Sequence, residues 1–483
     1  MSDNRQKLLL ASFFTLIAAG AGFAVRAGIL GDWSEQFGFT QTELGTITGG
    51  GLTGFGVVII LSSFFVDKVG YKPILVVAFV LHVLSAIVTV SATPIFDAAG
   101  KDSTYWCLFI GMFMFAIANG LCEAVINPLI TTLYSDKKTH YLNILHAGWP
   151  AGLIVGAILA YLFVGDAAAV THLRWEIPML FFLIPTLIYG LMVIKERFPI
   201  SEARAAGVTF VEMLKEFAAP VLLMLLVLHA MVGYVELGTD SWITNIMNNV
   251  IEGKAMLLFL YTSTIMFVLR FFAGPIVERI NPLGLLFVSA ILGCIGLLSL
   301  GTVETGVAIL GAATIYGVGK TFFWPTMLGV VGERYPKGGA LTLGAIGGVG
   351  MLSAGLLGGP GIGYTQDRFA SEQLQADNAP VYEQVKADQP NRFLFFKRIT
   401  GLDGAKVAAI QPDSPDFEVV QNARTEGGRM ALKVTAAVPA AMAVGYLILL
   451  IYFRLKGGYQ VEVLHGAKPD GERYTGGVEG PVE

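Results

Sequence analysis

The sequence predicts an all-α membrane protein with twelve transmembrane helices in two pseudo-symmetric six-helix bundles, and three observations support this fold class. Of the 483 residues, 54% are hydrophobic and 14% are charged, whereas soluble domains carry about 25% charged residues. Apolar runs of about 20 residues recur along the chain, and each is long enough to cross a hydrocarbon core as a helix. A weak repeat relates the two halves of the chain.

The apolar runs form two groups of six that are separated by a more polar stretch. The first six spans are expected near residues 8–31, 42–65, 73–92, 105–134, 141–164 and 176–195, and the second six near 217–249, 256–277, 282–301, 306–332, 340–364 and 430–454. The first run continues without a small-residue cleavage site, so we interpret it as a span and not as a signal peptide. The predicted domains are a bundle over 1–195, a linker over 196–216, a bundle over 217–454 and a tail over 455–483.

Basic residues gather on the loops that lie on the same side as both termini, among them Lys68, Lys137 and Arg334. Because cytoplasmic loops carry an excess of Lys and Arg, we expect both termini in the cytoplasm and the chain in the inner (plasma) membrane. The long connection 365–428 then lies outside the cell membrane. Its sparse apolar content favours a solvated or partly disordered loop, with a small lid over the outer mouth as the alternative.

The two halves share sequence features at matching places. The pair Asp67-Lys68 after the second span corresponds to Glu278-Arg279 after the eighth, Asp136-Lys137 after the fourth corresponds to Glu333-Arg334 after the tenth, and Pro128 corresponds to Pro325. A parallel repeat of this kind is expected of a transporter whose halves rock around a central site.

Ionisable residues inside membrane spans are costly, so each one is a functional hypothesis. The residues concerned are Arg26, Glu123, His146, His229, Glu236, Asp240, Arg270 and Lys320. Glu123 and Lys320 each lie five residues before a repeat proline, and their opposite charges would let them pair or flank a solute across a central cavity. A buried carboxylate can load and release a proton, so Glu123 is the predicted proton-coupling group. The alternative is a permanent salt bridge with Arg26 or Lys320 that only holds helices together.

The predicted solute-binding residues are Arg26, Asn127, His146, Trp149, Glu236, Lys320 and Trp324. Arg26 and Lys320 offer cationic groups to a carboxylate or to hydroxyl groups, and Asn127 can both donate to and accept from sugar hydroxyls. Trp149 offers an aromatic face beneath a sugar ring. The alternatives are charge compensation for Arg26, an interhelical hydrogen bond for Asn127 and plain packing for Trp149.

Two parts of the sequence resemble a known family. Between the second and third spans, Ser62 to Pro73 read SSFFVDKVGYKP, which resembles the signature of the major facilitator superfamily. In the fourth span, Gly120 to Pro128 read GLCEAVINP, and with HYLNILHAGWP in the fifth span this is similar to the fucose, glucose and galactose proton symporter family. The resemblance implies the major facilitator fold and proton-coupled sugar uptake. The first span departs from that family because it carries Ala27 where the family has an acid.

The same resemblance implies that charged loop residues on the cytoplasmic side act as gate pairs that latch one half against the other. The residues concerned are Asp67, Lys72, Asp136, Glu278, Arg279, Glu333 and Arg334. These residues are therefore not assigned to the solute.

We expect a secondary active transporter, namely a proton-coupled symporter of a monosaccharide or sugar derivative that works by alternating access as a monomer in the lipid bilayer. The alternatives are an organic anion or sugar-acid transporter or exchanger that uses Arg26 and Lys320, and, from another class, a non-transporting nutrient sensor. The sequence contains no nucleophile–base arrangement, phosphate-binding loop or metal-ligand spacing, so we expect no enzyme activity, cofactor or metal. The net charge of −4 argues against nucleic acid as a partner.

Overall fold

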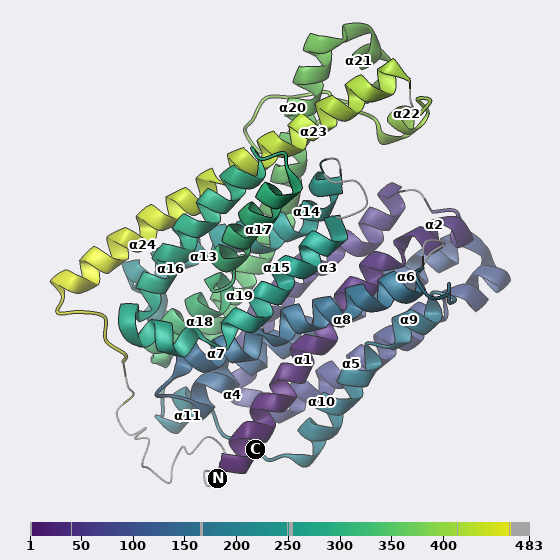
Figure 1. The fold of residues 1–483 in the computed structure, drawn as a ribbon. Coiled ribbons are helices and arrows are strands. Elements are labelled where there is room, and N and C mark those ends of the chain that lie inside the picture. The colour runs from purple at the N-terminus through teal and green to yellow at the C-terminus, as the bar shows by residue number, and fades with distance from the viewer. Residues whose placement is uncertain are drawn as a thin grey trace.

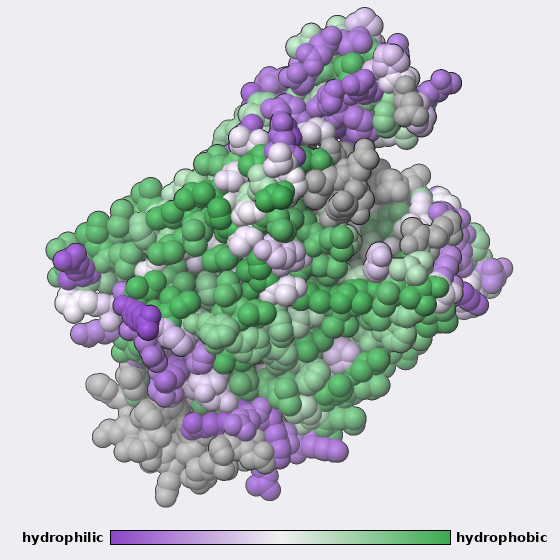
Figure 2. Space-filling view, viewed as in Figure 1, coloured by the Kyte–Doolittle hydropathy of each residue, from purple (hydrophilic) through white to green (hydrophobic). Residues whose placement is uncertain are grey.

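The computed structural model describes residues 2–39, 41–164, 168–248, 250, 255–412, 414–462 and 464. Its first six spans and its last six lie side by side as two helical bundles, coloured purple to blue and teal to yellow in Figure 1. Within these described ranges, eleven helices are long and apolar enough to cross a membrane, and the shorter apolar helix Ala255–Arg270 completes twelve. The predicted fold class is therefore confirmed. On the face shown in Figure 2, apolar surface covers the middle of the bundles, and polar residues gather toward the two ends.

The spans of the first half are α1, α3, α5, α6, α7 with α8, and α9 with α10. Their bounds are Ser2–Gly28, Gln41–Ser63, Tyr71–Val90, Ala92–Leu133, Lys138–His146 with Gly148–Phe163, and Glu176–Leu180 with Leu183–Lys195. The short helices α2 and α4 cover Leu30–Phe37 and Val66–Val69. Within α6 the backbone leaves helical geometry at Gly100, so the fourth span proper follows that residue.

The spans of the second half are α13 with α14, α15, α16, α17 with α18, α19 with α20, and α23 with α24. Their bounds are Pro220–Gly233 with Thr239–Asn248, Ala255–Arg270, Ala273–Leu300, Gly306–Lys320 with Phe323–Arg334, Gly339–Ser353 with Gly359–Asp377, and Pro415–Thr435 with Ala437–Leu455. Single π-helical turns, η2 and η4, join α13 to α14 and α19 to α20. The connection between the halves carries α11 (Glu202–Ala205) and α12 (Phe210–Lys215).

Two interior prolines break spans that meet between the halves. Pro150 lies at the start of α8 and Pro325 at the start of α18. Proline has no backbone N–H, so the carbonyl four residues earlier in the helix loses its usual donor. The two carbonyl groups that lack a helix donor for this reason are those of His146 and Thr321.

We call the end of the bundle that carries the start of α1 and the end of α24 the terminal end, and the opposite end the projection end. From the projection end, α20 and α23 extend beyond the bundle and carry α21 (Ala379–Val385) and α22 (Gly404–Ala408), as Figure 1 shows at the top. Buried Leu374, Val381 and Val420 belong to a separate apolar cluster there. The expectation of a partly disordered loop over 365–428 is therefore wrong, because a few well-spaced apolar residues suffice to pack two prolonged helices together.

The first part of the predicted tail packs against the bundle. Residues after Leu455 turn back against the bundle, where the Tyr459 hydroxyl donates to Glu333 and the Glu462 N–H donates to the Glu333 carbonyl. Leu464 packs near α11. The remainder of the predicted tail, residues 465–483, lies outside the described residues.

Candidate functional site

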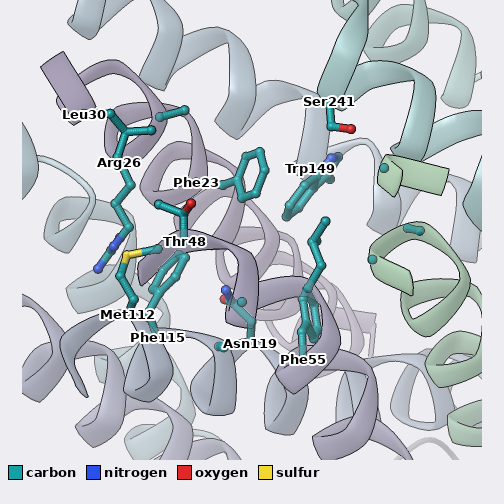
Figure 3. Close-up of a pocket in the computed structure, with 17 residues that line it drawn as sticks. Phe23, Arg26, Leu30, Thr48, Phe55, Met112, Phe115, Asn119, Trp149 and Ser241 are labelled. Atoms are coloured by element: carbon teal, nitrogen blue, oxygen red, sulfur yellow. The ribbon is translucent and has the colours of Figure 1, made fainter. Parts of the chain in front are cut away.

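A cavity of about 290 Å³ lies between the two bundles, on the projection side of the molecule's middle. The first half contributes most of its wall, from α1, α2, α3, α6 and α8, and the second half contributes Ser241, Ala354, Gly355 and Gly359. Phe23, Phe55 and Trp149 supply aromatic surface, while Asn119 and Thr48 supply polar groups (Figure 3). A cavity that joins both halves and is largely apolar with few polar groups is typical of a small-molecule site.

Two predicted solute-binding residues, Arg26 and Trp149, line this cavity. The Trp149 ring lies 5.9 Å from the Phe23 ring, centroid to centroid, at a tilt of 46°. Arg26 contributes the stem of its side chain, and Figure 3 shows its guanidinium group turned toward Phe115 and away from Trp149. That group lies 3.7 Å from the Phe115 ring centroid and 4.6 Å from that of Phe182.

Arg26 is held by aromatic rings rather than by an acid. Its guanidinium donates to the Gly22 carbonyl at 3.1 Å and to the Ser85 hydroxyl at 3.5 Å. A cation over aromatic faces is stabilised by the negative potential of the rings, and burial strengthens that attraction. Within the described residues no carboxylate pairs with Arg26, so the alternative interpretation, charge compensation of Glu123 by Arg26, does not hold.

Below the cavity, toward the terminal end, lies a buried polar network of the first half. Glu123 follows the cavity residue Asn119 by about one turn of α6. The Asn127 amide donates to the Glu123 carboxylate at 2.7 Å, and the Asn127 carbonyl oxygen lies 2.9 Å from His146 Nε2. All three side chains are buried. Asn127 thus contacts both Glu123 and His146, and neither Asn127 nor His146 lines the cavity.

The second half adds a buried ion pair, Arg270–Glu236, and a partly buried one, Lys320–Asp240. Arg270 Nη2 lies 2.9 Å from Glu236 Oε1, and Lys320 Nζ lies 2.5 Å from Asp240 Oδ1. The other Glu236 oxygen accepts the Trp324 N–H at 3.2 Å. Lys320 therefore pairs with Asp240 and not with Glu123, its equivalent in the repeat.

Arg270 joins the two networks. Its Nη1 donates to the His146 carbonyl oxygen at 2.6 Å, across the boundary between the halves. From Glu123 to Glu236, a chain of direct contacts therefore passes through Asn127, His146 and Arg270. The sequence identified Arg270 and Asp240 only as ionisable residues at membrane depth, because pairing across helices that are distant in sequence leaves no local signal.

Trp324 is placed by packing. Its ring lies 4.6 Å from the His229 ring, centroid to centroid, and against Gly350. Both ring nitrogens of His229 are buried without a hydrogen-bond partner among the described residues. Trp324 thus packs against His229 and Gly350 next to the buried ion pair of Glu236, and it does not line the cavity.

The terminal end is closed by contacts between the halves. The Glu333 carboxylate accepts from the Thr139 hydroxyl at 2.6 Å and from the Thr139 N–H at 3.2 Å. The Asp67 carboxylate accepts the Ala340 N–H at 3.3 Å. Burial raises the pKa of Asp67, and hydrogen bonds from Ser201 and Ala340 oppose that rise. The exposed pair Lys137–Glu278, at 3.4 Å, adds a third link.

Other predicted gate residues do not link the halves in this structure. Lys72 donates to the Ile194 carbonyl, inside the first half. Arg334 pairs with Glu462 of the tail at 2.8 Å. Asp136 and Arg279 are exposed and pair with none of the residues described. Sequence reasoning also missed Lys138, which is buried in contact with Glu202 at 2.8 Å and with the Gly332 carbonyl at 3.0 Å.

Comparison with known proteins shows which family the chain belongs to. The model of the Major Facilitator Superfamily matches residues 10–359. A "Protein TsgA homolog" from Buchnera aphidicola subsp. Schizaphis graminum is 26% identical over 204 residues, which are 42% of this chain and 48% of that protein. The chain thus matches about half the length of this curated relative.

Solved structures show the same fold at low sequence identity. The E. coli fucose:proton symporter FucP is 15% identical with a TM-score of 0.62, covering 91% of this chain and 98% of that one. The proton:xylose symporter XylE is 13% identical with a TM-score of 0.67, covering 96% and 98%. The human organic anion transporter MFSD10 is 11% identical with a TM-score of 0.59, covering 92% and 99%.

Proposed function

Since the chain belongs to the major facilitator superfamily and is a membrane transporter rather than an enzyme, we propose that it is a proton-coupled symporter of a monosaccharide or sugar derivative. It works by alternating access, as a monomer, in the inner membrane with both termini in the cytoplasm. On this proposal, the solute enters the cavity at the projection end, while the terminal end stays closed.

One observation carries the proton-coupling part of the proposal. In the described part of the chain, buried Glu236 is locked in an ion pair with Arg270, and partly buried Asp240 is locked in an ion pair with Lys320. Among the described residues, the Glu123 carboxylate hydrogen-bonds only to the neutral amide of Asn127 and forms no ion pair. A buried carboxylate without a cationic contact exchanges a proton without first breaking an ion pair, so Glu123 is the proposed proton carrier.

The cavity supports a solute with both an apolar face and hydroxyl groups. Trp149 and Phe23 supply flat aromatic surface, and the Asn119 amide nitrogen supplies a donor, since the Asn119 oxygen lies 2.9 Å from His82 Nε2. Binding there would place the solute about one helix turn from Glu123. Occupancy and protonation can then bias the same movement of the halves, which is the condition for coupling. One proton that crosses a potential of 100 mV contributes about 2.3 kcal/mol.

A second candidate keeps the fold and changes the solute to an organic anion. Its support is Arg26, whose stem lines the cavity and whose charge has no carboxylate contact in the described part of the chain. Lys320 gives less support than expected because Asp240 already neutralises it. The nutrient sensor differs from both candidates, since a sensor would bind a solute without flux.

The experiment is uptake of labelled fucose, galactose and galacturonate into proteoliposomes, with and without an imposed proton gradient. Glu123→Gln should abolish gradient-driven accumulation and retain exchange, whereas Glu304→Gln, at an exposed acid, should behave as wild type. Unchanged accumulation in Glu123→Gln removes that residue from coupling. Uptake of galacturonate alone, lost in Arg26→Gln, favours the anion transporter. Absence of flux for all three solutes refutes sugar transport.

A further inference from the structure

The two carbonyl groups that lack helix donors lie near each other, one from each half. His146 precedes Pro150 by four residues, and Thr321 precedes Pro325 by four residues. Each carbonyl therefore needs a donor from elsewhere, because a buried backbone acceptor is costly to leave unpaired. The same residue, Arg270, satisfies both.

Arg270 uses all three nitrogens of its guanidinium group. Its Nη1 donates to the His146 carbonyl at 2.6 Å, its Nε to the Thr321 carbonyl at 2.8 Å and its Nη2 to Glu236 at 2.9 Å. The side chain is 1% exposed. A planar fork with fixed donor directions can make these bonds together, whereas a lysine ammonium is a point charge on a flexible stem.

We propose that Arg270 is a positioning residue that couples the charge of the buried carboxylates to the movement of the two halves. This inference rests on the proposed proton coupling. Arg270 acts through Glu236 and the His146 carbonyl and has no contact with the cavity.

The charges around Arg270 explain how it would respond to a proton. Glu236, Asp240 and Glu123 all attract it electrostatically, and Glu236 alone among them contacts it. Lys320, His146 and His229 are the basic groups on the neighbouring helices. When a proton neutralises one of these carboxylates, Arg270 is held less firmly, and its bond to the first half weakens. By reciprocity, loss of the His146 bond on rocking changes the proton affinity of the carboxylates.

The test needs no identified solute, because the proton itself is the probe. Spin labels at Val69→Cys and Ile280→Cys, both exposed and on opposite halves of the terminal end, report opening of that end in reconstituted protein. Their distance distribution is measured from about pH 5 to about pH 9. The wild type should shift between two distances across this range, and Arg270→Gln should lose the pH dependence.

Two further variants separate this role from simple packing. Arg270→Lys keeps the charge and loses the fork, so it should lose most of the pH dependence as well. Pro150→Ala supplies the missing N–H to His146 in place of Arg270, and should reduce the pH-dependent shift in population about fivefold, at the lower end of known coupling energies. Pro185→Ala in α10 and Arg368→Gln in the projection are the matched controls and should leave the shift unchanged.

The outcomes are distinct. A pH-dependent shift that persists in folded Arg270→Gln overturns the inference, as does a shift that Pro150→Ala and Pro185→Ala reduce equally. Should Arg270→Gln fail to fold, Pro150→Ala decides alone, and an unchanged shift there counts against the inference. A wild type with no pH-dependent shift contradicts the proposed proton coupling instead.

Discussion

Replacing Glu333 by Gln should open the terminal end. In the closed arrangement the carboxylate accepts two hydrogen bonds from Thr139 of the other half, at 2.6 and 3.2 Å. A hydrogen bond to a charged group contributes about 1 kcal/mol more than one to a neutral group. Losing the charge should therefore disfavour the closed end by about 2 kcal/mol, which is about a 30-fold change in the ratio of open to closed molecules.

Spin labels at Val69→Cys and Ile280→Cys measure that ratio from the areas of the long-distance and short-distance populations. Thr139→Val removes one of the two bonds while keeping the shape, so it should give roughly half of the free-energy change. Thr264→Val, at an exposed threonine on α15 that bonds only within its own helix, is the control and should not change the ratio. An open fraction in Glu333→Gln that equals that of the wild type would refute the reasoning that these bonds hold the end closed.

Three other predictions address charge, packing and the projection. Burial raises the pKa of Asp67 in the folded protein, so Asp67 stabilises the fold fully below its unfolded-state pKa, and this stabilisation is lost as the pH rises through its folded-state pKa. The Tm of Asp67→Asn relative to that of the wild type should therefore increase with pH. A Tm difference that stays constant with pH would contradict this. A Cβ atom on Gly233 would lie 1.9 Å from the Gly350 carbonyl oxygen, so Gly233→Ala should lower the Tm or prevent folding. The control is Gly45→Ala, where an added Cβ has no atom within 4 Å, and it should leave the Tm unchanged. Leu374→Ala should destabilise the projection by about 3 kcal/mol and accelerate amide exchange in α21 and α22, while equal acceleration throughout the bundle would show that the projection is not a separate folding unit.

The fold could be predicted because its signals are local. Each apolar run indicates a span by its own length, and Asp67 and Glu333 follow their spans at positions that the repeat makes comparable. The pairing of charges could not be predicted in this way. Lys320 was matched to Glu123 through the repeat, but the nearest acid in space is Asp240, on a helix of its own half.

The projection and the site show a second limit of sequence reasoning. The composition of 365–428 is polar, but composition does not reveal that Leu374 and Val420, on two prolonged helices, join one buried apolar cluster. In the same way, Arg26 was recognised as a buried cation, and the rings of Phe115 and Phe182 that hold it come from α6 and from the segment between α9 and α10. Both the packing of the projection and the surroundings of Arg26 depend on contacts between parts of the chain that are distant in sequence.

The returning tail has a consequence for the energy of the transport cycle. Glu333 and Tyr459 both follow the midpoint of the chain, so in the proposed alternating-access cycle they would move together, whereas Thr139 would move with the first half. The Tyr459 hydroxyl, 2.7 Å from the Glu333 carboxylate, would therefore still donate a hydrogen bond to Glu333 after the two Thr139 donors have moved away. Because Glu333 would keep one hydrogen-bond donor throughout, the free energy of the partly open state is lower than it would be with an unpaired carboxylate.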